Sequence, residues 1–224
     1  MNVGVLLAAG ASTRMGEPKA LVRWKGQSFL AHGVRALWAA CDVVIAVLGS
    51  QAKVVRRGAE EEFERLVESG GLSADLHAAK GHGARSLEVR FETNRAWKSG
   101  MFGSARIGLA AAVRTRPSAI LVLPVDNPEV RGATVANLGT VMSEAIGSFG
   151  KSGGRDFAYA LVPRHRGRRG HPLVLSPALA RAIAKDTDAE DLGDAVRRNA
   201  RLVGYLDVAD KGILANRNTK KKKS

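Results

Sequence analysis

A glycine-rich loop with two fixed cations follows the first apolar segment of the chain. Residues 3–7 carry no charge, and the sequence AAGASTRMGEPK comes directly after them. The loop combines glycines, a hydroxyl and two cations, at Gly10, Gly16, Ser12, Arg14 and Lys19. Glycine lets a backbone approach a ligand closely, and backbone N–H groups, a guanidinium and an ammonium together suit a polyphosphate. The pattern therefore predicts a triphosphate-binding loop after a buried strand.

The spacing of this loop differs from the two commoner phosphate-binding loops. A Walker A loop has its lysine directly after the last glycine, whereas Gly16 is followed by Glu17 and the lysine comes three residues later. The dinucleotide fingerprint G-x-G-x-x-G is also missing after this strand. An ordinary glycine-rich turn would explain both glycines, but not Arg14 together with Lys19.

A carboxylate follows the fourth apolar segment of the chain. The predicted strand 119–123 continues into PVDNP, so Asp126 lies just beyond its carboxyl end. Ligands of open α/β sheets bind at that edge. A single carboxylate together with phosphate oxygens is a usual environment for Mg²⁺. We therefore expect Asp126 to hold a metal ion, and the alternative is that it caps a turn or a helix.

Two further segments carry polar groups at places where a ligand could bind. Residues 94–104 read NRAWKSGMFGS, and their hydroxyls and free N–H groups at a helix start would suit an anion. Asn94 could form a hydrogen bond with a base or a ribose, whereas Trp97 and Met101 are expected to pack in the core. The triplet GHP contains His171, which could contact a phosphate or a second metal ion, although a lone histidine is more often structural.

The order of the elements predicts how these motifs are positioned. Apolar strand-like segments alternate with helical ones, which indicates a mostly parallel sheet covered by helices on both faces. Strands are expected at 3–7, 43–48, 87–94, 119–123, 157–162, 173–175 and 202–206. Helices are expected at 29–41, 59–67, 107–113, 134–146, 177–184 and around 192–196, with Ser28 and Ser176 as N-caps. Residues 70–86 are expected to form a surface loop.

Composition limits the class of protein. The 224 residues are enough for one α/β domain with a full core. The single cysteine, Cys41, cannot form an internal disulfide and is expected to be buried. No apolar run approaches 18 residues and the first ten residues lack a basic start, so we expect a cytoplasmic protein without a membrane span or a secretion signal.

The net charge of +14 has two main sources. One is a loop with four arginines, Arg164, Arg166, Arg168 and Arg169, and the other is the run Lys220–Lys223. Because no aromatic residue accompanies the lysines, we interpret them as a solvated tail rather than a nucleic-acid site. The arginine loop, just before His171, would attract an anionic small molecule.

Together these motifs resemble the MobA-like nucleotidyltransferases, which include molybdenum cofactor cytidylyltransferases and guanylyltransferases. All nine fixed positions of L-A-A-G-x-S-x-R-M-G-x-x-K match, and Asp126 lies in a D-x-P segment similar to the family's metal-binding motif. Residues 94–104 resemble the family segment N-x-x-[WY]-x-x-G-[ML]-x-x-S. The resemblance implies a single-domain, Rossmann-like three-layer α/β/α sandwich, similar to nucleotide-diphospho-sugar transferases, over residues 1–215. A basic, disordered tail would follow over residues 216–224.

The resemblance also implies a reaction. A nucleoside monophosphate would pass from a nucleoside triphosphate to a phosphorylated acceptor, with Mg²⁺ as cofactor and pyrophosphate as product. Ala9 and the GHP triplet match the cytidylyltransferase branch, so CTP is expected before GTP, and molybdopterin is the expected acceptor. The alternatives are a sugar or alditol phosphate as acceptor, or a non-catalytic nucleotide-binding protein of the same fold. A molybdoenzyme or its maturation factor is an expected partner.

Finally, the resemblance assigns roles to residues. The predicted catalytic residues are Arg14, Lys19 and Asp126. The predicted nucleotide- and acceptor-binding residues are Ala8, Ala9, Gly10, Ser12, Arg14, Gly16, Lys19, Asn94, Ser104 and His171. Asp126 and Asn218 would bind the metal. Family members usually finish near D-x-D-T-P-x-D, whereas this chain reads GILANRNT. Asn218 offers a carbonyl oxygen but no charge, so weaker metal binding is expected.

Overall fold

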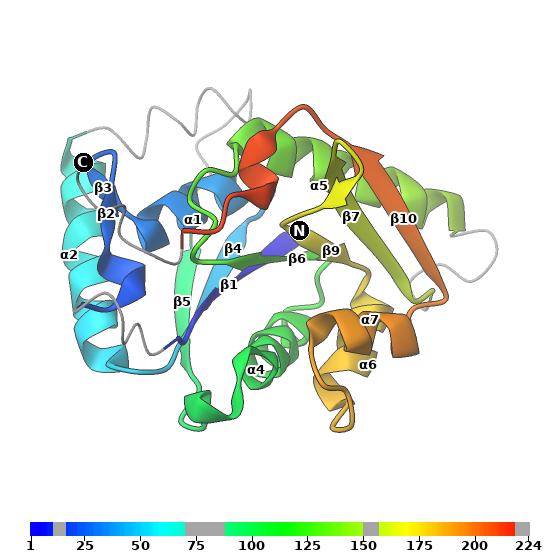
Figure 1. The fold of residues 1–224 in the computed structure, drawn as a ribbon, viewed down its shortest axis with the longest axis horizontal. Coiled ribbons are helices and arrows are strands. Elements are labelled where there is room, and N and C mark those ends of the chain that lie inside the picture. Colours follow the sequence, from blue (N-terminus) through cyan, green and yellow to red (C-terminus); the bar gives the residue numbers. More distant parts are fainter. Residues whose placement is uncertain (11–16, 70–87, 150–156, 218–224) are drawn as a thin grey trace.

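A β-sheet runs through the centre of the protein, with helices on both faces (Figure 1). The computed structural model describes residues 1–10, 17–69, 88–149 and 157–217. Within these residues the sheet has eight strands, which are β1 (Asn2–Ala8), β4 (Val43–Leu48), β5 (Glu88–Thr93), β6 (Ala119–Pro124), β7 (Tyr159–His165), β8 (Arg168–Arg169), β9 (Leu173–Leu175) and β10 (Leu202–Asp207). Their order is β10-β7-β9-β6-β1-β4-β5, and β8 pairs with β7.

The central strands are buried along almost their whole length. Every residue of β4 and β6 is buried, and β1 is buried from Val3 to Ala8. β1 pairs in parallel with both neighbours, so that Val5 lies opposite Ile45 on one side and Val122 on the other. Continuous apolar strands of this kind are typical of parallel sheets with both faces covered. The predicted α/β architecture with a mostly parallel sheet is therefore confirmed.

Strand β9 is antiparallel to both of its neighbours. It pairs with β6 and β7, which are otherwise parts of two parallel groups. Because β9 is reversed, its first residue, Leu173, lies opposite Val122 near the carboxyl end of β6. The residues just before β9, including His171, therefore reach the edge at which the parallel strands end. We call this edge the carboxyl edge.

The helices divide into two sets, one on each face of the sheet (Figure 1). On one face, α1 (Phe29–Trp38), α2 (Ala52–Glu68) and α5 (Gly132–Phe149) share a core with β1, β4 and β6. On the other face, α4 (Met101–Arg114), α6 (Pro177–Lys185) and α7 (Leu192–Asn199) share a second core. Each central strand contributes to both cores because successive side chains alternate between the faces. The result is a single three-layer domain.

Two predicted helix starts are confirmed at the level of hydrogen bonds. The Ser28 hydroxyl accepts a bond from the backbone N–H of Ala31, and the Ser176 hydroxyl accepts one from Leu179. A serine at this position satisfies an N–H group that the helix itself leaves without a partner.

Other boundaries differ from the predicted ones. α2 begins at Ala52 rather than at residue 59, and α4 begins at Met101 rather than at residue 107. The first turns of both helices begin with partly or fully exposed residues, and that of α4 also contains Gly103 and Ser104, so neither turn shows the apolar periodicity on which the prediction depended. A short hairpin, β2 (Arg23–Trp24) and β3 (Gln27–Ser28), and three 3₁₀ turns, η1 (Lys19–Leu21), η2 (Trp97–Ser99) and η4 (Lys211–Leu214), were not predicted.

Two expectations from composition can be compared with the structure. Cys41 is buried, as expected. In the parts of the chain that the structure describes, no helix combines the length and the apolar composition that crossing a bilayer requires. The predicted surface loop at 70–86 lies outside the described residues.

Candidate functional site at the carboxyl edge

Backbone hydrogen bonds tie together the loops that follow the parallel strands. The N–H of Val125, after β6, donates to the carbonyl of Leu7 in β1 at 3.0 Å. The N–H of Asn94, after β5, donates to Leu48 in β4 at 2.7 Å. The segments carrying three of the sequence motifs are thus held at one edge of the sheet.

Lys19 and Asp126 meet at this edge. The Lys19 Nζ lies 2.9 Å from the Asp126 Oδ2, and the two side chains are only 17% and 15% exposed. Lys19 is the last residue of the predicted triphosphate loop and the first residue of η1. Asp126 lies in the loop after β6. The sequence motifs that should act on one nucleotide therefore converge through these two residues. The Asp126 carboxylate also provides oxygen ligands of the kind that a hard metal ion takes.

The backbone after β1 is closely packed. Ala8 and Ala9 are buried, and Gly10 is exposed. A β-carbon added at Gly49 would lie 2.3 Å from the carbonyl oxygen of Ala9, so only glycine permits this approach between the loops after β1 and β4. Of the remaining predicted contacts, Ser12, Arg14, Gly16 and Asn218 lie outside the described residues.

Asn94 and Ser104 are brought together inside the protein. The Asn94 amide donates to the Ser104 hydroxyl at 2.9 Å, and its carbonyl oxygen accepts from the N–H of Ala96 at 2.9 Å. Both residues are buried, so this pair fixes the turn that leads from β5 into α4. Their predicted contact with a nucleotide stays a prediction. The expectation that Met101 packs in the core is wrong, since its side chain is 60% exposed at the start of α4.

His171 reaches the carboxyl edge because β9 is reversed. Its backbone N–H donates to the carbonyl of Ile213 at 3.0 Å, and its Nδ1 is buried without a hydrogen-bond partner among the described residues. Burial lowers the pKa of His171, while the nearby charge of Asp126 acts in the opposite direction. The imidazole is therefore neutral near pH 7 and adds no positive charge beside Asp126.

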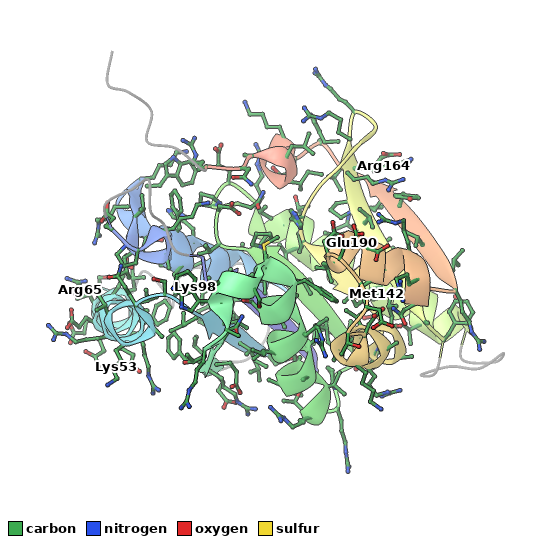
Figure 2. The ribbon with its side chains drawn as sticks, turned by 60° about the horizontal axis from the view of Figure 1, so that its bottom comes forward. Lys53, Arg65, Lys98, Met142, Arg164 and Glu190 are labelled. Carbon is green, nitrogen blue, oxygen red and sulfur yellow. The ribbon has the colours of Figure 1, made fainter. Side chains whose placement is uncertain are left out.

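The arginine loop before His171 is held in place by its neighbours. Arg164 forms a bidentate ion pair with Asp207, with distances of 3.1 and 2.8 Å. The guanidinium groups of Arg164 and Arg169 lie 5.0 and 5.2 Å from the centre of the Tyr205 ring. Arg164 extends outward from β7, as Lys53 and Arg65 extend from α2 (Figure 2). Positive charge is thus present on several sides of the protein, and not only next to His171.

A few residues at this edge were missed by sequence analysis. The side-chain amide of Asn127 donates to the carbonyl of Ala215 at 3.0 Å, and the backbone N–H of Arg217 donates to the carbonyl of Asp126 at 2.9 Å. Arg217 also forms an ion pair with Glu129 at 2.7 Å. Arg217 is therefore tied to the domain, although the sequence assigns it to the tail 216–224. The rest of that predicted tail, 218–224, is outside the described residues.

The metal that the sequence predicts can be compared with the ligands on this edge. Within the described residues, there is no cluster of three histidine, cysteine or acidic residues that could enclose an ion. Asp126 is a single carboxylate, which fits an Mg²⁺ or Mn²⁺ ion that takes most of its other ligands from phosphates and water. A dedicated protein cage does not fit this set of residues.

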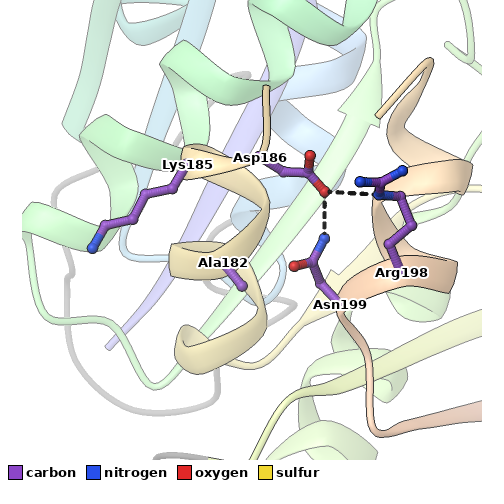
Figure 3. A pocket seen from close by; sticks show the side chains of 5 residues that line it. All are labelled: Ala182, Lys185, Asp186, Arg198 and Asn199. Carbon is purple, nitrogen blue, oxygen red and sulfur yellow. Dashed lines mark hydrogen bonds and ion pairs between the residues drawn. The ribbon is translucent and has the colours of Figure 1, made fainter. Parts of the chain in front are cut away.

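A pocket between two helices lies away from the carboxyl edge. It lies between α6 and α7 and is lined by Ala182, Lys185, Asp186, Arg198 and Asn199 (Figure 3). Asp186 accepts hydrogen bonds from Asn199 at 2.6 Å and from the N–H groups of Asp188 and Ala189. These bonds make Asp186 a structural link between the two helices.

The Asp186 link should depend on pH. The hydrogen bond from Asn199, the backbone N–H groups and the charge of Arg198 hold the pKa of Asp186 below its ordinary value. The link therefore stabilises the fold above the ordinary aspartate pKa of about 3.9, and this stability is lost as the pH falls through the lower pKa of the folded state. We expect Asp186→Asn to lower the melting temperature at pH 7 by about 2–4 °C, a difference that disappears at acidic pH.

Thermal unfolding of both proteins between pH 2.5 and pH 7 checks this prediction. Asp188→Asn, which removes a mostly exposed carboxylate, is the matched control and should melt like the unchanged protein. A difference between Asp186→Asn and the unchanged protein that stays constant over this range would contradict the prediction.

The protein has an open, mostly parallel α/β sheet with a cation and a carboxylate at its carboxyl edge. Proteins of this class bind ligands such as nucleotides at that edge. The sequence model of the MobA-like NTP transferase domain matches residues 4–202. The chain therefore belongs to the MobA-like nucleotidyltransferase family.

Two curated relatives show different degrees of similarity. The chain is 32% identical over 212 residues to the nicotine blue oxidoreductase of Paenarthrobacter nicotinovorans, a match that covers 92% of this chain and 87% of that protein. It is 35% identical over 80 residues to a probable molybdenum cofactor guanylyltransferase of Bacillus cereus (strain Q1), a match that covers 36% of each protein.

Among solved structures, the fold is similar to that of Rv0371c from Mycobacterium tuberculosis H37Rv. One crystal structure of that protein has a TM-score of 0.63 at 22% identity, and the match covers 92% of this chain and 87% of that one. A second, a complex with manganese, has a TM-score of 0.57 at 23% identity, and the match covers 92% and 88%. At this level of identity, the similarity concerns the fold.

Proposed function

We propose that the protein is a metal-dependent nucleotidyltransferase that transfers CMP from CTP to molybdopterin or a similar phosphorylated acceptor and releases pyrophosphate. The observation that carries this proposal is the contact of 2.9 Å between Lys19 and Asp126 at the carboxyl edge. It joins the phosphate-loop motif and the strand-end carboxylate in a protein of the nucleotidyltransferase family.

The chemistry that follows needs no general base. An ionised oxygen of the acceptor's phosphate attacks the α-phosphorus in line, the new P–O bond forms, and the bond to the β-phosphate oxygen breaks. Catalysis then depends on positioning and charge stabilisation. Lys19, together with Arg14, stabilises the charge that develops on pyrophosphate. Asp126, with Asn218, would hold a divalent ion, Mg²⁺ or Mn²⁺, and this ion would supply positive charge to the phosphates.

His171 belongs to the acceptor side of this proposal. Its neutral imidazole can exchange a hydrogen bond with the acceptor's phosphate, and the neighbouring arginines favour an anionic acceptor. The buried contacts of Asn94 and Ser104 shape the start of α4, where the backbone N–H groups would face the nucleotide. The reaction would take place in the cytoplasm, where nucleoside triphosphates are available, and a molybdoenzyme or its maturation factor would receive the product.

The choice between CTP and GTP rests on different observations. Ala9 and the GHP triplet support CTP, through their similarity to the cytidylyltransferase branch. The Bacillus cereus relative is named a guanylyltransferase, which supports GTP. An experiment that compares both nucleotides is therefore part of the test.

Thermal unfolding with each of the four nucleoside triphosphates, with and without Mg²⁺, tests the proposal. A bound ligand at about 100 times its dissociation constant stabilises the folded state by about 2.7 kcal/mol. For a chain of this length, we expect CTP with Mg²⁺ to raise the melting temperature by about 5–10 °C, and EDTA to abolish the increase. If GTP alone stabilises the protein, GTP replaces CTP as the proposed donor. If none of the four nucleotides stabilises it, the proposed function is overturned.

Release of pyrophosphate then identifies the acceptor. Molybdopterin, a sugar phosphate and an alditol phosphate are offered in parallel with the nucleotide that binds. Release with a sugar or alditol phosphate would change the acceptor but not the reaction. Nucleotide binding without release for any acceptor would favour the non-catalytic alternative.

A second candidate function is supported by the relative that matches almost the whole chain. That protein is named an oxidoreductase of nicotine blue, and its match covers a far larger share of this chain than the match to the guanylyltransferase. A visible absorption spectrum of the purified protein would reveal a bound chromophore, and reduction of nicotine blue, with a reduced nicotinamide nucleotide added as the electron donor, can be followed by its colour. Reduction without any nucleotide-dependent release of pyrophosphate would favour this candidate.

A further inference from the structure

The chain returns to the carboxyl edge after β10. We call residues 208–217, which include η4, the return segment; η4 lies beside the loops at this edge (Figure 1). Its Asp210 accepts bonds from the N–H of Arg131 and the hydroxyl of Thr134, both at 2.9 Å. Further along, Ile213 accepts the N–H of His171 and Ala215 accepts the amide of Asn127. The return segment is therefore anchored to the loop that carries Asp126, to the first turn of α5 and to the residues just before β9.

Arg217 adds contacts to two different parts of the site. Its backbone N–H donates to Asp126, and its guanidinium pairs with Glu129 in the same loop. The guanidinium also lies 5.0 Å from the centre of the Trp24 ring. The Arg217 and Glu129 side chains are only 31% and 25% exposed, so this pair is less screened than an ordinary surface pair.

Trp24 belongs to the segment that carries Lys19. It lies in β2, a few residues behind η1, and its carbonyl is 2.7 Å from the His32 Nε2 in α1. The rings of Trp24 and His32 are in edge contact, with centroids 4.9 Å apart. Trp24 is held against α1 by its contacts with His32. The Arg217 guanidinium, which contacts both Trp24 and Glu129, therefore connects the Lys19 segment with the Asp126 loop.

This connection does not use the direct contact between Lys19 and Asp126. In the proposed reaction, Lys19 binds a triphosphate and Asp126 binds a metal ion. The ion pair between these two side chains then opens. The link through Arg217 can persist during this change, because none of its atoms is part of that pair.

We propose that Arg217 is a positioning residue. It holds the Lys19 segment and the Asp126 loop at a fixed separation while the ion pair between Lys19 and Asp126 opens and the nucleotide and the metal ion bind. The inference rests on the proposed function for its catalytic consequence. Small displacements between reacting groups are costly, so loss of this link should lower turnover more than it lowers stability.

Turnover of three single variants tests the catalytic part. We expect Arg217→Gln to lower kcat for pyrophosphate release by about 10- to 100-fold, with little change in the KM for the acceptor. Arg217→Lys keeps the charge but not the planar group that covers the ring, and should lose less. Arg131→Gln is the matched control, since its guanidinium is mostly exposed and 3.8 Å from Asp210. A kcat of Arg217→Gln within twofold of the control would overturn the proposal.

Hydrogen exchange of the unliganded protein tests the link itself and requires no turnover. In Arg217→Gln, exchange should become faster in residues 17–24 and in residues 125–130 together, and it should not change in the Arg131→Gln control. Faster exchange in only one of the two segments, or in neither, would overturn the link. If the unchanged protein transfers no nucleotide, the proposed function fails, and the exchange result still decides whether Arg217 joins the two segments.

Discussion

Lys19→Ala is expected to lower the turnover number by about 10²–10³-fold, the effect of losing one donor that stabilises developing charge. The Lys19 ammonium lies 2.9 Å from Asp126 and is mostly buried, so its charge would act with little screening on a phosphate bound at this edge. The measurement is the initial rate of pyrophosphate release by purified protein at saturating nucleotide and acceptor.

The control for this variant is Lys185→Ala, which removes an exposed ammonium from α6. Its turnover should equal that of the unchanged protein. The melting temperature of Lys19→Ala is measured alongside, because the substitution takes this cation away from the mostly buried Asp126 carboxylate. Unchanged turnover of Lys19→Ala would remove this residue from the mechanism.

Asp126→Asn is expected to reduce turnover by about 10³-fold, because the loop loses the carboxylate that is proposed to hold the divalent ion. The substitution keeps the size of the side chain and one acceptor oxygen, so the loss reports mainly on charge. The concentration of Mg²⁺ or Mn²⁺ needed for half-maximal activity should rise at the same time. Rates measured over a titration of each metal check both expectations.

Asp207→Asn is the matched control for charge, since Asp207 is an exposed carboxylate paired with Arg164. It should leave the metal titration unchanged. An Asp126→Asn protein that keeps both its rate and its metal requirement would show that the ion is held elsewhere.

The part of the fold that sequence could predict is the part with regular burial. β4 and β9 were predicted to the residue, because each is a short apolar run between polar or glycine-rich neighbours. The direction of β9 could not be predicted, since three apolar residues carry no information about which way a strand runs. The hairpin of β2 and β3 was missed because two-residue strands leave no periodic pattern.

The site, too, has features that sequence could predict and features that it could not. The meeting of Lys19 and Asp126 could be anticipated, because both follow strands that end at the same edge of a parallel sheet. The burial of Asn94 against Ser104 could not be read from a motif, since an asparagine that orders a turn and one that binds a base look alike in sequence. Arg217 stands beside the C-terminal lysines, so its charge looked like part of a solvated tail.

The route of the return segment has a practical consequence for handling the protein. At Arg217 the backbone passes directly over the Asp126 carbonyl. Met1, in contrast, accepts the N–H of Ser118, just before β6, and so lies at the opposite end of the strands. An affinity tag placed ahead of Met1 would leave the carboxyl edge clear, whereas a fusion partner joined directly to Arg217 would start out beside it.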